Sequence, residues 1–206
     1  MTGPRTLVLV RHGESEANAA GEFTGGRDVP LTMRGREQAR AAGRRLLERD
    51  LCPDAVFCST RSRTVDSAHL ILDATSRSDL VVVQSAALDE RDYGALTGLT
   101  HHEAEARWGA DQVKVWRRSY ATAPPGGESI RDTLARVAPY YLTQVLPAAM
   151  RGIALVVAHG NSLRALVAAV EGLDADAIAS LTLPTGCVRA YRLGSNAEVE
   201  SCEFVA

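Results

Sequence analysis

Two segments of the chain share one layout, a short apolar run that leads into a histidine followed by glycine. Leu7–Val10 precedes Arg11-His12-Gly13, and Ile153–Ala158 precedes His159-Gly160-Asn161. A continuous apolar run without alternation is typical of a strand buried on both faces of a sheet. Because ligands of open α/β sheets bind at the carboxyl ends of the strands, we expect both imidazoles to face one pocket if the two strands are neighbours.

The rest of the chain alternates between strand and helix patterns. Further strands are expected at Ala55–Cys58, Leu80–Val83 and two runs within Cys187–Val205 that flank a turn at Ser195-Asn196. Helices are expected from a Thr32 cap to about Arg49, at Arg61–Ala74, around His102–Trp108 and Ala110–Arg118, from Ile130 to Val145 with a kink at Pro139, and from His159 to about Glu171. This alternation predicts an α/β sheet with right-handed crossovers, in a single domain over residues 1–206.

Composition and charge exclude few functions, but they give no indication of a nucleic-acid or membrane partner. The chain has 46% apolar and 23% charged residues and a net charge of −2, so overall charge gives no indication of nucleic-acid binding. Lys114 is the only lysine among many arginines; a GC-rich genome explains this at surface positions, and anion binding is the alternative where arginines are paired. Scattered cysteines and the lack of a long apolar segment predict reduced thiols, a cytoplasmic location and no membrane partner.

Several competing chemistries lack their motif in this sequence. There is no G-x-x-x-x-G-K-[ST] segment, and no cysteine has an arginine six positions later, which disfavours P-loop and cysteine-dependent phosphate chemistry. Asp174-Ala175-Asp176 superficially resembles an aspartyl nucleophile pair, but no strand precedes it and we interpret it as a solvated helix start. His101-His102 would point to different helix faces, so no metal site is expected.

The histidine pocket suits phosphoryl transfer. Neutral imidazole is a good nucleophile near neutral pH, and the phosphohistidine it forms needs cations around its equatorial oxygens. Arg11 adjoins His12, and Arg61 and Arg63 follow the second predicted strand. Asp89-Glu90, after the third, offers a carboxylic acid to protonate the departing oxygen.

Several motifs of the chain resemble those of a known enzyme family. Leu9-Val10-Arg11-His12-Gly13-Glu14-Ser15 is similar to the signature of the histidine phosphatase superfamily, and within it the chain resembles the short bacterial form of the 2,3-bisphosphoglycerate-dependent phosphoglycerate mutases. The further segments that carry this resemblance, almost end to end, are Phe23–Gly25, Leu31–Gly35, Glu90–Leu96, Val115–Tyr120, Pro124–Ser129, Ala158–Leu166 and Pro184–Gly186.

The resemblance implies a three-layer α/β sandwich, with a mostly parallel central sheet and helices on both faces. It also implies interconversion of 3-phosphoglycerate and 2-phosphoglycerate through a phosphohistidine on His12, primed by 2,3-bisphosphoglycerate without a metal, in a homodimer or homotetramer. Arg11, Arg63 and His159 would hold the phosphoryl group, and Glu90 would donate and accept the proton. The implied substrate-binding residues are Ser15, Asn18, Thr24, Gly25, Arg91, Tyr93, His101, Arg117, Arg118, Gly160 and Asn161.

Three positions depart from the pattern of the family. His101 stands where a lysine is usual, Ala17 where a tryptophan is usual, and Gly26 where an aromatic residue is usual. These departures keep a second hypothesis open, a histidine phosphatase or specialised mutase for another small phosphorylated acid. A third hypothesis, an inactive protein that keeps only the fold, is opposed by His12, Glu90 and His159, because packing requires none of them.

Overall fold

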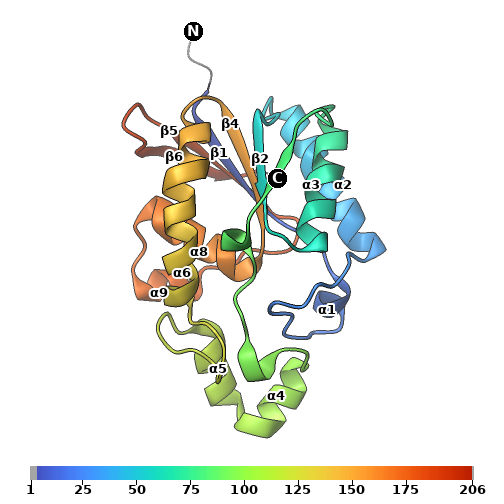
Figure 1. Cartoon of the computed structure of the whole chain (residues 1–206), viewed down its shortest axis with the longest axis vertical. Coiled ribbons are helices and arrows are strands. Elements are labelled where there is room, and N and C mark those ends of the chain that lie inside the picture. Colours follow the sequence, from blue (N-terminus) through green and yellow to red (C-terminus); the bar gives the residue numbers. More distant parts are fainter. Residues whose placement is uncertain (1–3, 206) are drawn as a thin grey trace.

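A six-stranded sheet forms the centre of the computed structural model, which describes residues 4–205 (Figure 1). Its strands are β1 (Thr6–Arg11), β2 (Ala55–Cys58), β3 (Val82–Gln84), β4 (Ile153–Ala158), β5 (Val188–Leu193) and β6 (Val199–Phe204). They lie in the order β3-β2-β4-β1-β5-β6. The first four are parallel, and β5 and β6 continue the sheet as antiparallel strands. The predicted mostly parallel sheet is confirmed.

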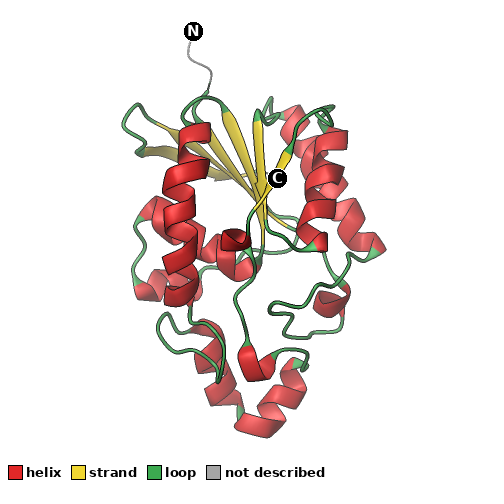
Figure 2. Ribbon diagram, in the orientation of Figure 1, coloured by secondary structure: helices red, strands yellow, loops and turns green. Residues whose placement is uncertain are grey.

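Helices cover both faces of the sheet, which gives three layers (Figures 1 and 2). The helices are α1 (Glu16–Ala19), α2 (Met33–Glu48), α3 (Ser62–Ala74), α4 (His101–Trp108), α5 (Ala110–Arg118), α6 (Ile130–Tyr140), α7 (Leu146–Ala149), α8 (Gly160–Glu171) and α9 (Ala175–Ser180). None of those within residues 4–205 is long and apolar enough to cross a lipid bilayer.

The side chains of β1 show why its sequence is apolar without alternation. Leu7 and Leu9 pack in a cluster with residues of α6 and α8. Val8 and Val10 point to the other face, where they pack with residues of α2 and α3. All four side chains are buried. A strand buried on both faces can place no polar residue until it ends, so the first functional groups appear at Arg11 and His12.

Two predicted elements differ from the structure. The third strand is Val82–Gln84 instead of Leu80–Val83, because only these residues pair with β2. The helix predicted from Ile130 to Val145 is α-helical only to Tyr140, and a π-helical turn, Tyr141–Val145, follows Pro139. Proline has no N–H to donate to the preceding turn, so an interruption near this residue is expected.

The sheet order places the two histidine segments side by side. Strands β1 and β4 are parallel neighbours, with Arg11 opposite Ala158, so His12 and His159 emerge together at the carboxyl edge. The loop after β1 is held close to the start of α2: a Cβ atom on Gly13 would lie 1.9 Å from the Gly35 carbonyl oxygen. Only glycine permits this approach.

Helices α4 and α5 form a separate layer beyond the carboxyl edge of the sheet (Figure 1). Their buried residues Ala104, Val113 and Trp116 pack with Phe23 and Leu96. This cluster joins the loop after α1 to the end of α5, where Arg117 and Arg118 lie. The fold therefore places an arginine pair opposite the two histidines.

Candidate active site

The loop after β1 orients the His12 imidazole. The side chain is 2% exposed, and Nδ1 lies 2.6 Å from the Gly13 carbonyl oxygen. A carbonyl can only accept, so Nδ1 donates and the lone pair of the neutral ring is on Nε2. Burial lowers the pKa of His12 well below its usual value, and the positive charges of Arg11 and Arg63 act in the same direction. The imidazole is therefore neutral at physiological pH.

His159 lies against His12, with ring centroids 5.0 Å apart in an edge-to-face arrangement. Its Nε2 is 2.7 Å from the Ser59 hydroxyl, whereas the buried Nδ1 has no hydrogen-bond partner among residues 4–205. Burial lowers the pKa of His159 well below its usual value, followed by the charge of Arg63.

Two arginines flank the histidines without a carboxylate partner in the described part of the chain. Arg11 donates from Nη1 to the Leu183 carbonyl (2.7 Å), and Arg63 donates from Nη1 to the Arg27 carbonyl (2.8 Å). Their buried Arg11 Nε and Arg63 Nη2 atoms have no acceptor within residues 4–205. Buried N–H groups are normally satisfied, so these arginine atoms indicate an anion site beside His12, next to the His159 ring nitrogen that has no partner within residues 4–205.

The structure distinguishes the two adjacent carboxylates. Asp89 is 9% exposed; it accepts from the Thr60 backbone amide (2.9 Å) and hydroxyl (2.8 Å) and pairs with Arg61 at 2.9 Å. Glu90 lines the cavity, and its Oε1 accepts from the backbone amides of Arg91 (2.8 Å) and Asn161 (3.1 Å). With Oε1 occupied by two donors, a proton carried by Glu90 resides on Oε2. Glu90 is therefore the available acid–base group.

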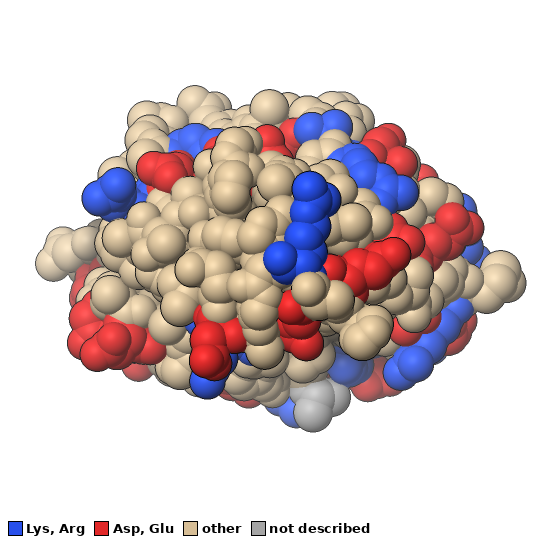
Figure 3. Space-filling view, turned by 90° about the horizontal axis from the view of Figure 1, so that it is seen from below, with Lys and Arg blue, Asp and Glu red and all other residues tan. Residues whose placement is uncertain are grey.

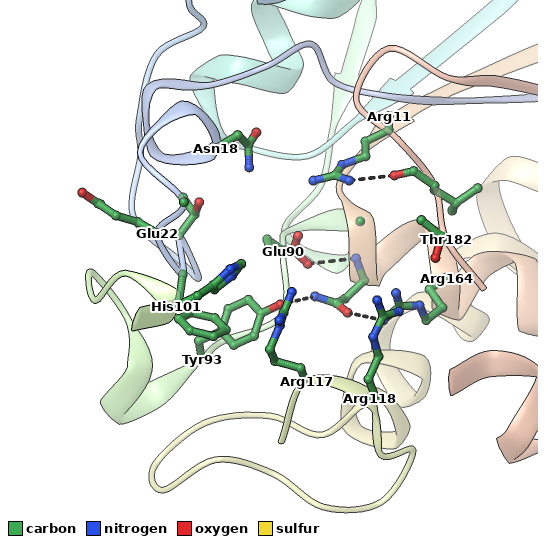
Figure 4. A pocket seen from close by; sticks show the side chains of 16 residues that line it. Arg11, Asn18, Glu22, Glu90, Tyr93, His101, Arg117, Arg118, Arg164 and Thr182 are labelled. Carbon is green, nitrogen blue, oxygen red and sulfur yellow. Dashed lines mark hydrogen bonds between the residues drawn. The ribbon is translucent and has the colours of Figure 1, made fainter. Parts of the chain in front are cut away.

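A cavity of about 300 Å³ opens above these groups (Figure 4). Its charged side chains are mainly cationic: Arg11 enters from one side, and Arg117, Arg118 and Arg164 enter from the other. The outer face at the α4–α5 end instead mixes acidic and basic side chains (Figure 3). Positive charge is thus concentrated inside the cavity, as small anionic ligands require.

Most of the predicted site residues meet at this cavity. The predicted residues that line it are Arg11, Asn18, Thr24, Glu90, Tyr93, His101, Arg117, Arg118, Gly160 and Asn161. His12, Arg63 and His159 are buried beside it. Ser15, Gly25 and Arg91 do not line it, and the contacts of each show a supporting position.

Ser15 orients Asn18. Its hydroxyl caps α1, and the Ser15 amide (3.1 Å) and hydroxyl (3.0 Å) both donate to Asn18 Oδ1. The Asn18 Nδ2 group is consequently the end that faces the cavity (Figure 4). Gly25 is buried at φ 53°, where a Cβ would lie 2.8 Å from the Thr97 hydroxyl, so it forms a tight turn behind Thr24.

Arg91 lies behind Tyr93. Its side chain is 0% exposed, its guanidinium stacks 4.5 Å from the centre of the Tyr93 ring, and Nη1 donates to the Trp116 carbonyl at 2.9 Å. These contacts tie the Glu90 loop to the residue before Arg117. Nε and Nη2 of Arg91 have no acceptor within residues 4–205.

His101 packs edge-to-face on Phe23, with ring centroids 4.6 Å apart. Burial lowers the pKa of His101, and the charge of Arg117 lowers it further. A lysine at this position would carry a fixed charge, whereas His101 is mainly neutral at pH 7.

The sequence interpretation missed Arg164, Ser59 and Thr182. Arg164 lies one helical turn after Asn161, so its spacing within the His159 segment was the available signal. Ser59 and Thr182 come from segments with no spacing relation to the histidines, and only the fold brings them near. Within residues 4–205, no group of three histidine, cysteine or acidic side chains is placed to hold a metal ion.

The two buried histidines predict a pH dependence of stability. Both have a pKa below that of the unfolded chain, so below about pH 6.5 the unfolded state binds more protons and the free energy of unfolding falls with falling pH. Between pH 6.5 and 5.5, wild type should lose stability more steeply than His12→Gln, by up to ~1.4 kcal/mol per pH unit. Urea unfolding at several pH values measures the slopes, and equal slopes would contradict a neutral buried His12.

Comparison with known proteins places this site in a class. Residues 7–201 match the model of the histidine phosphatase superfamily (branch 1), and the chain belongs to this superfamily. Within it, the chain is 51% identical over 202 residues to the 2,3-bisphosphoglycerate-dependent phosphoglycerate mutase of Mesorhizobium japonicum, with 98% of each chain covered. It is 52% identical to the enzyme of the same name from Methylobacterium sp., covering 98% of this chain and 97% of the relative. The chain belongs to this mutase family.

Solved structures support the same fold at lower identity. A mycobacterial glucosyl-3-phosphoglycerate phosphatase matches with a TM-score of 0.82 at 28% identity, covering 98% of both chains. An Escherichia coli protein described as a putative α-ribazole-5′-P phosphatase matches with a TM-score of 0.80 at 27% identity, over 97% of this chain and 95% of that one.

Proposed function

We propose that the chain is a 2,3-bisphosphoglycerate-dependent phosphoglycerate mutase that interconverts 3-phosphoglycerate and 2-phosphoglycerate. The main observation is the pairing of a neutral, buried His12 nucleophile with a cavity that arginines line on both sides. The relatives at about half identity over nearly the whole chain carry this name.

Transfer to the substrate begins from His12 phosphorylated at Nε2. A substrate hydroxyl oxygen attacks phosphorus, the P–Nε2 bond breaks, and its electron pair returns to the imidazole. Glu90 Oε2 takes the hydroxyl proton at the same time. Arg11 and Arg63 hold the equatorial oxygens of the phosphoryl group with N–H atoms that have no acceptor within residues 4–205. His159 holds them from Nδ1 in the tautomer in which its Nε2 accepts from the Ser59 hydroxyl.

The same residues then return a phosphoryl group to His12, this time from the other phosphate of the bisphosphate intermediate. The bisphosphate turns within the cavity, His12 Nε2 attacks the second phosphorus, and Glu90 returns its proton to the departing oxygen. Arg117 and Arg118 hold the groups that are not reacting in each orientation. Asn18 Nδ2 and Thr24 complete the wall around the substrate.

The initial phosphoryl group would come from 2,3-bisphosphoglycerate, and the unpaired N–H atoms beside His12 fit one of its phosphates. Arginines supply the stabilising charge in this scheme, which assigns no step to a metal ion. The family resemblance further leads us to propose a cytoplasmic homodimer or homotetramer acting in glycolysis and gluconeogenesis.

A product assay tests the function directly. Purified protein should convert 3-phosphoglycerate to 2-phosphoglycerate, with a rate that 2,3-bisphosphoglycerate stimulates and that exceeds release of inorganic phosphate. Isomer and free phosphate are measured in the same samples by NMR. Phosphate release faster than isomerisation, from this or another phosphorylated acid, would instead support the phosphatase hypothesis.

A further inference from the structure

Arg164 is a fourth arginine of the cavity, and the mechanism above leaves it without a role. It lies on α8, one turn after Asn161, and enters the cavity beside Arg118 (Figure 4). Nε donates to the Leu181 carbonyl at 3.0 Å, and Nη1 donates to Asn161 Oδ1 at 2.9 Å. These bonds fix the guanidinium plane and leave Nη2 without a protein acceptor in the described chain.

The charge of Arg164 is not compensated by the protein. No carboxylate among residues 4–205 lies within 4.0 Å of it, whereas other arginines, such as Arg36 with Asp66 and Arg136 with Glu128, form ion pairs at 3.0 Å. Burial lowers the pKa of Arg164 to about 10, which still leaves the side chain charged at pH 7. A partly buried cation without a counter-ion destabilises a protein unless a ligand supplies the opposite charge.

Arg117 and Arg118, which neighbour Arg164, also lack a carboxylate partner within residues 4–205. Arg118 makes one long hydrogen bond, 3.4 Å to the Ala179 carbonyl, and the Arg117 guanidinium lies 5.8 Å from the Phe23 ring centre. Of the two acidic residues in the cavity, Glu22 pairs with Arg27 at 2.8 Å, so Glu90 is the remaining carboxylate. The cavity therefore holds an excess of positive charge on the side away from Arg11.

We infer that Arg164 is a specificity-determining residue that binds, with Arg118, the anionic group of the substrate remote from the reacting phosphoryl group. That group is the carboxylate of a phosphoglycerate or the phosphate that it holds away from the transferring phosphoryl group, since a guanidinium binds either oxyanion. Through Asn161, whose Nδ2 donates to the Tyr93 hydroxyl at 2.9 Å, the same side chain also orders the neighbouring wall.

Equilibrium binding tests this inference, which rests on the proposed function. Calorimetric titrations compare wild type, Arg164→Gln and the exposed-arginine control Arg131→Gln with three probes: 3-phosphoglycerate, glycerol 3-phosphate and inorganic phosphate. Arg164→Gln should weaken 3-phosphoglycerate binding about 10- to 100-fold, as loss of a charged hydrogen bond does, and leave inorganic phosphate unchanged. Inorganic phosphate reports on the anion site beside His12, because it has no remote group. Unchanged glycerol 3-phosphate binding identifies the carboxylate as the contact, and an equal loss with inorganic phosphate binding unchanged identifies the phosphate that the substrate holds away from His12.

An Asn161→Ala background separates direct contact from positioning. If Arg164 binds the anion itself, Asn161→Ala with Arg164→Gln should bind 3-phosphoglycerate at least about 10-fold more weakly than Asn161→Ala alone. No further loss, unchanged 3-phosphoglycerate binding by Arg164→Gln, or a loss that extends to inorganic phosphate would overturn the inference. A wild-type protein that neither binds nor isomerises 3-phosphoglycerate would instead overturn the proposed function.

Discussion

Replacement of His12 by alanine is expected to reduce isomerisation by about 10⁵–10⁶-fold, the loss seen when a covalent nucleophile is removed. Neither of the two nearby candidate nucleophiles in the described chain, His159 and Cys58, can take over its position. His159 has its Nε2 against Ser59, and Cys58, the last residue of β2, is buried with a pKa raised to about 12. Its thiolate is therefore not available at neutral pH.

Steady-state isomerisation and circular dichroism together measure this effect. His69→Ala is the matched control, because His69 is an exposed histidine on α3 and should leave the rate unchanged. His12→Asn keeps a polar side chain in the buried position, so it still tests the role of the imidazole if the alanine variant fails to fold. A folded His12→Asn protein with more than about one-hundredth of the wild-type rate would contradict a phosphohistidine mechanism.

Glu90→Gln is expected to slow phosphoryl transfer by about 10²–10⁴-fold, the range for lost general acid–base catalysis. The amide oxygen can still accept from the Arg91 and Asn161 backbone amides, so the loop should keep its position. The amide nitrogen that replaces Oε2 cannot take up a proton. Rapid-quench measurement of a single transfer step isolates this effect from substrate binding.

Two comparisons make the Glu90 result specific. Glu16→Gln, an exposed glutamate on the short helix α1, should leave the transfer rate unchanged. Asp89→Asn tests the neighbouring carboxylate, whose oxygens are occupied by Thr60 and Arg61. If Glu90→Gln were nearly as fast as wild type while Asp89→Asn lost about 10²-fold or more, proton transfer would be reassigned to Asp89.

Local patterns made much of the fold predictable. The apolar runs of β1 and β4 identified the central strands, and the Thr32 cap marked the start of α2 that the structure shows. The predicted bounds of the third strand were wrong. This edge strand pairs with β2 through three residues only, and so short a strand shows little hydrophobic periodicity in the sequence. The helix propensities of single residues also do not predict the π-helical turn after Pro139.

The site was predictable where chemistry follows directly from a strand end. His12, His159 and Glu90 each follow a strand within a few residues, and their meeting at one cavity required only that the strands share an edge. The supporting contacts were not predictable, because they join distant segments. Nothing in the local sequence shows that Arg91 stacks behind Tyr93, or that Arg164 enters the cavity beside Arg118.

In the proposed mechanism, a phosphoryl group passes through His12. Incubation with ³²P-labelled 2,3-bisphosphoglycerate, rapid quenching in base and mass spectrometry of the peptide after β1 tests it most directly. We expect a base-stable, acid-labile label on His12 that 3-phosphoglycerate removes at the rate of turnover. Label on another residue, or isomerisation with no label at all, would contradict it.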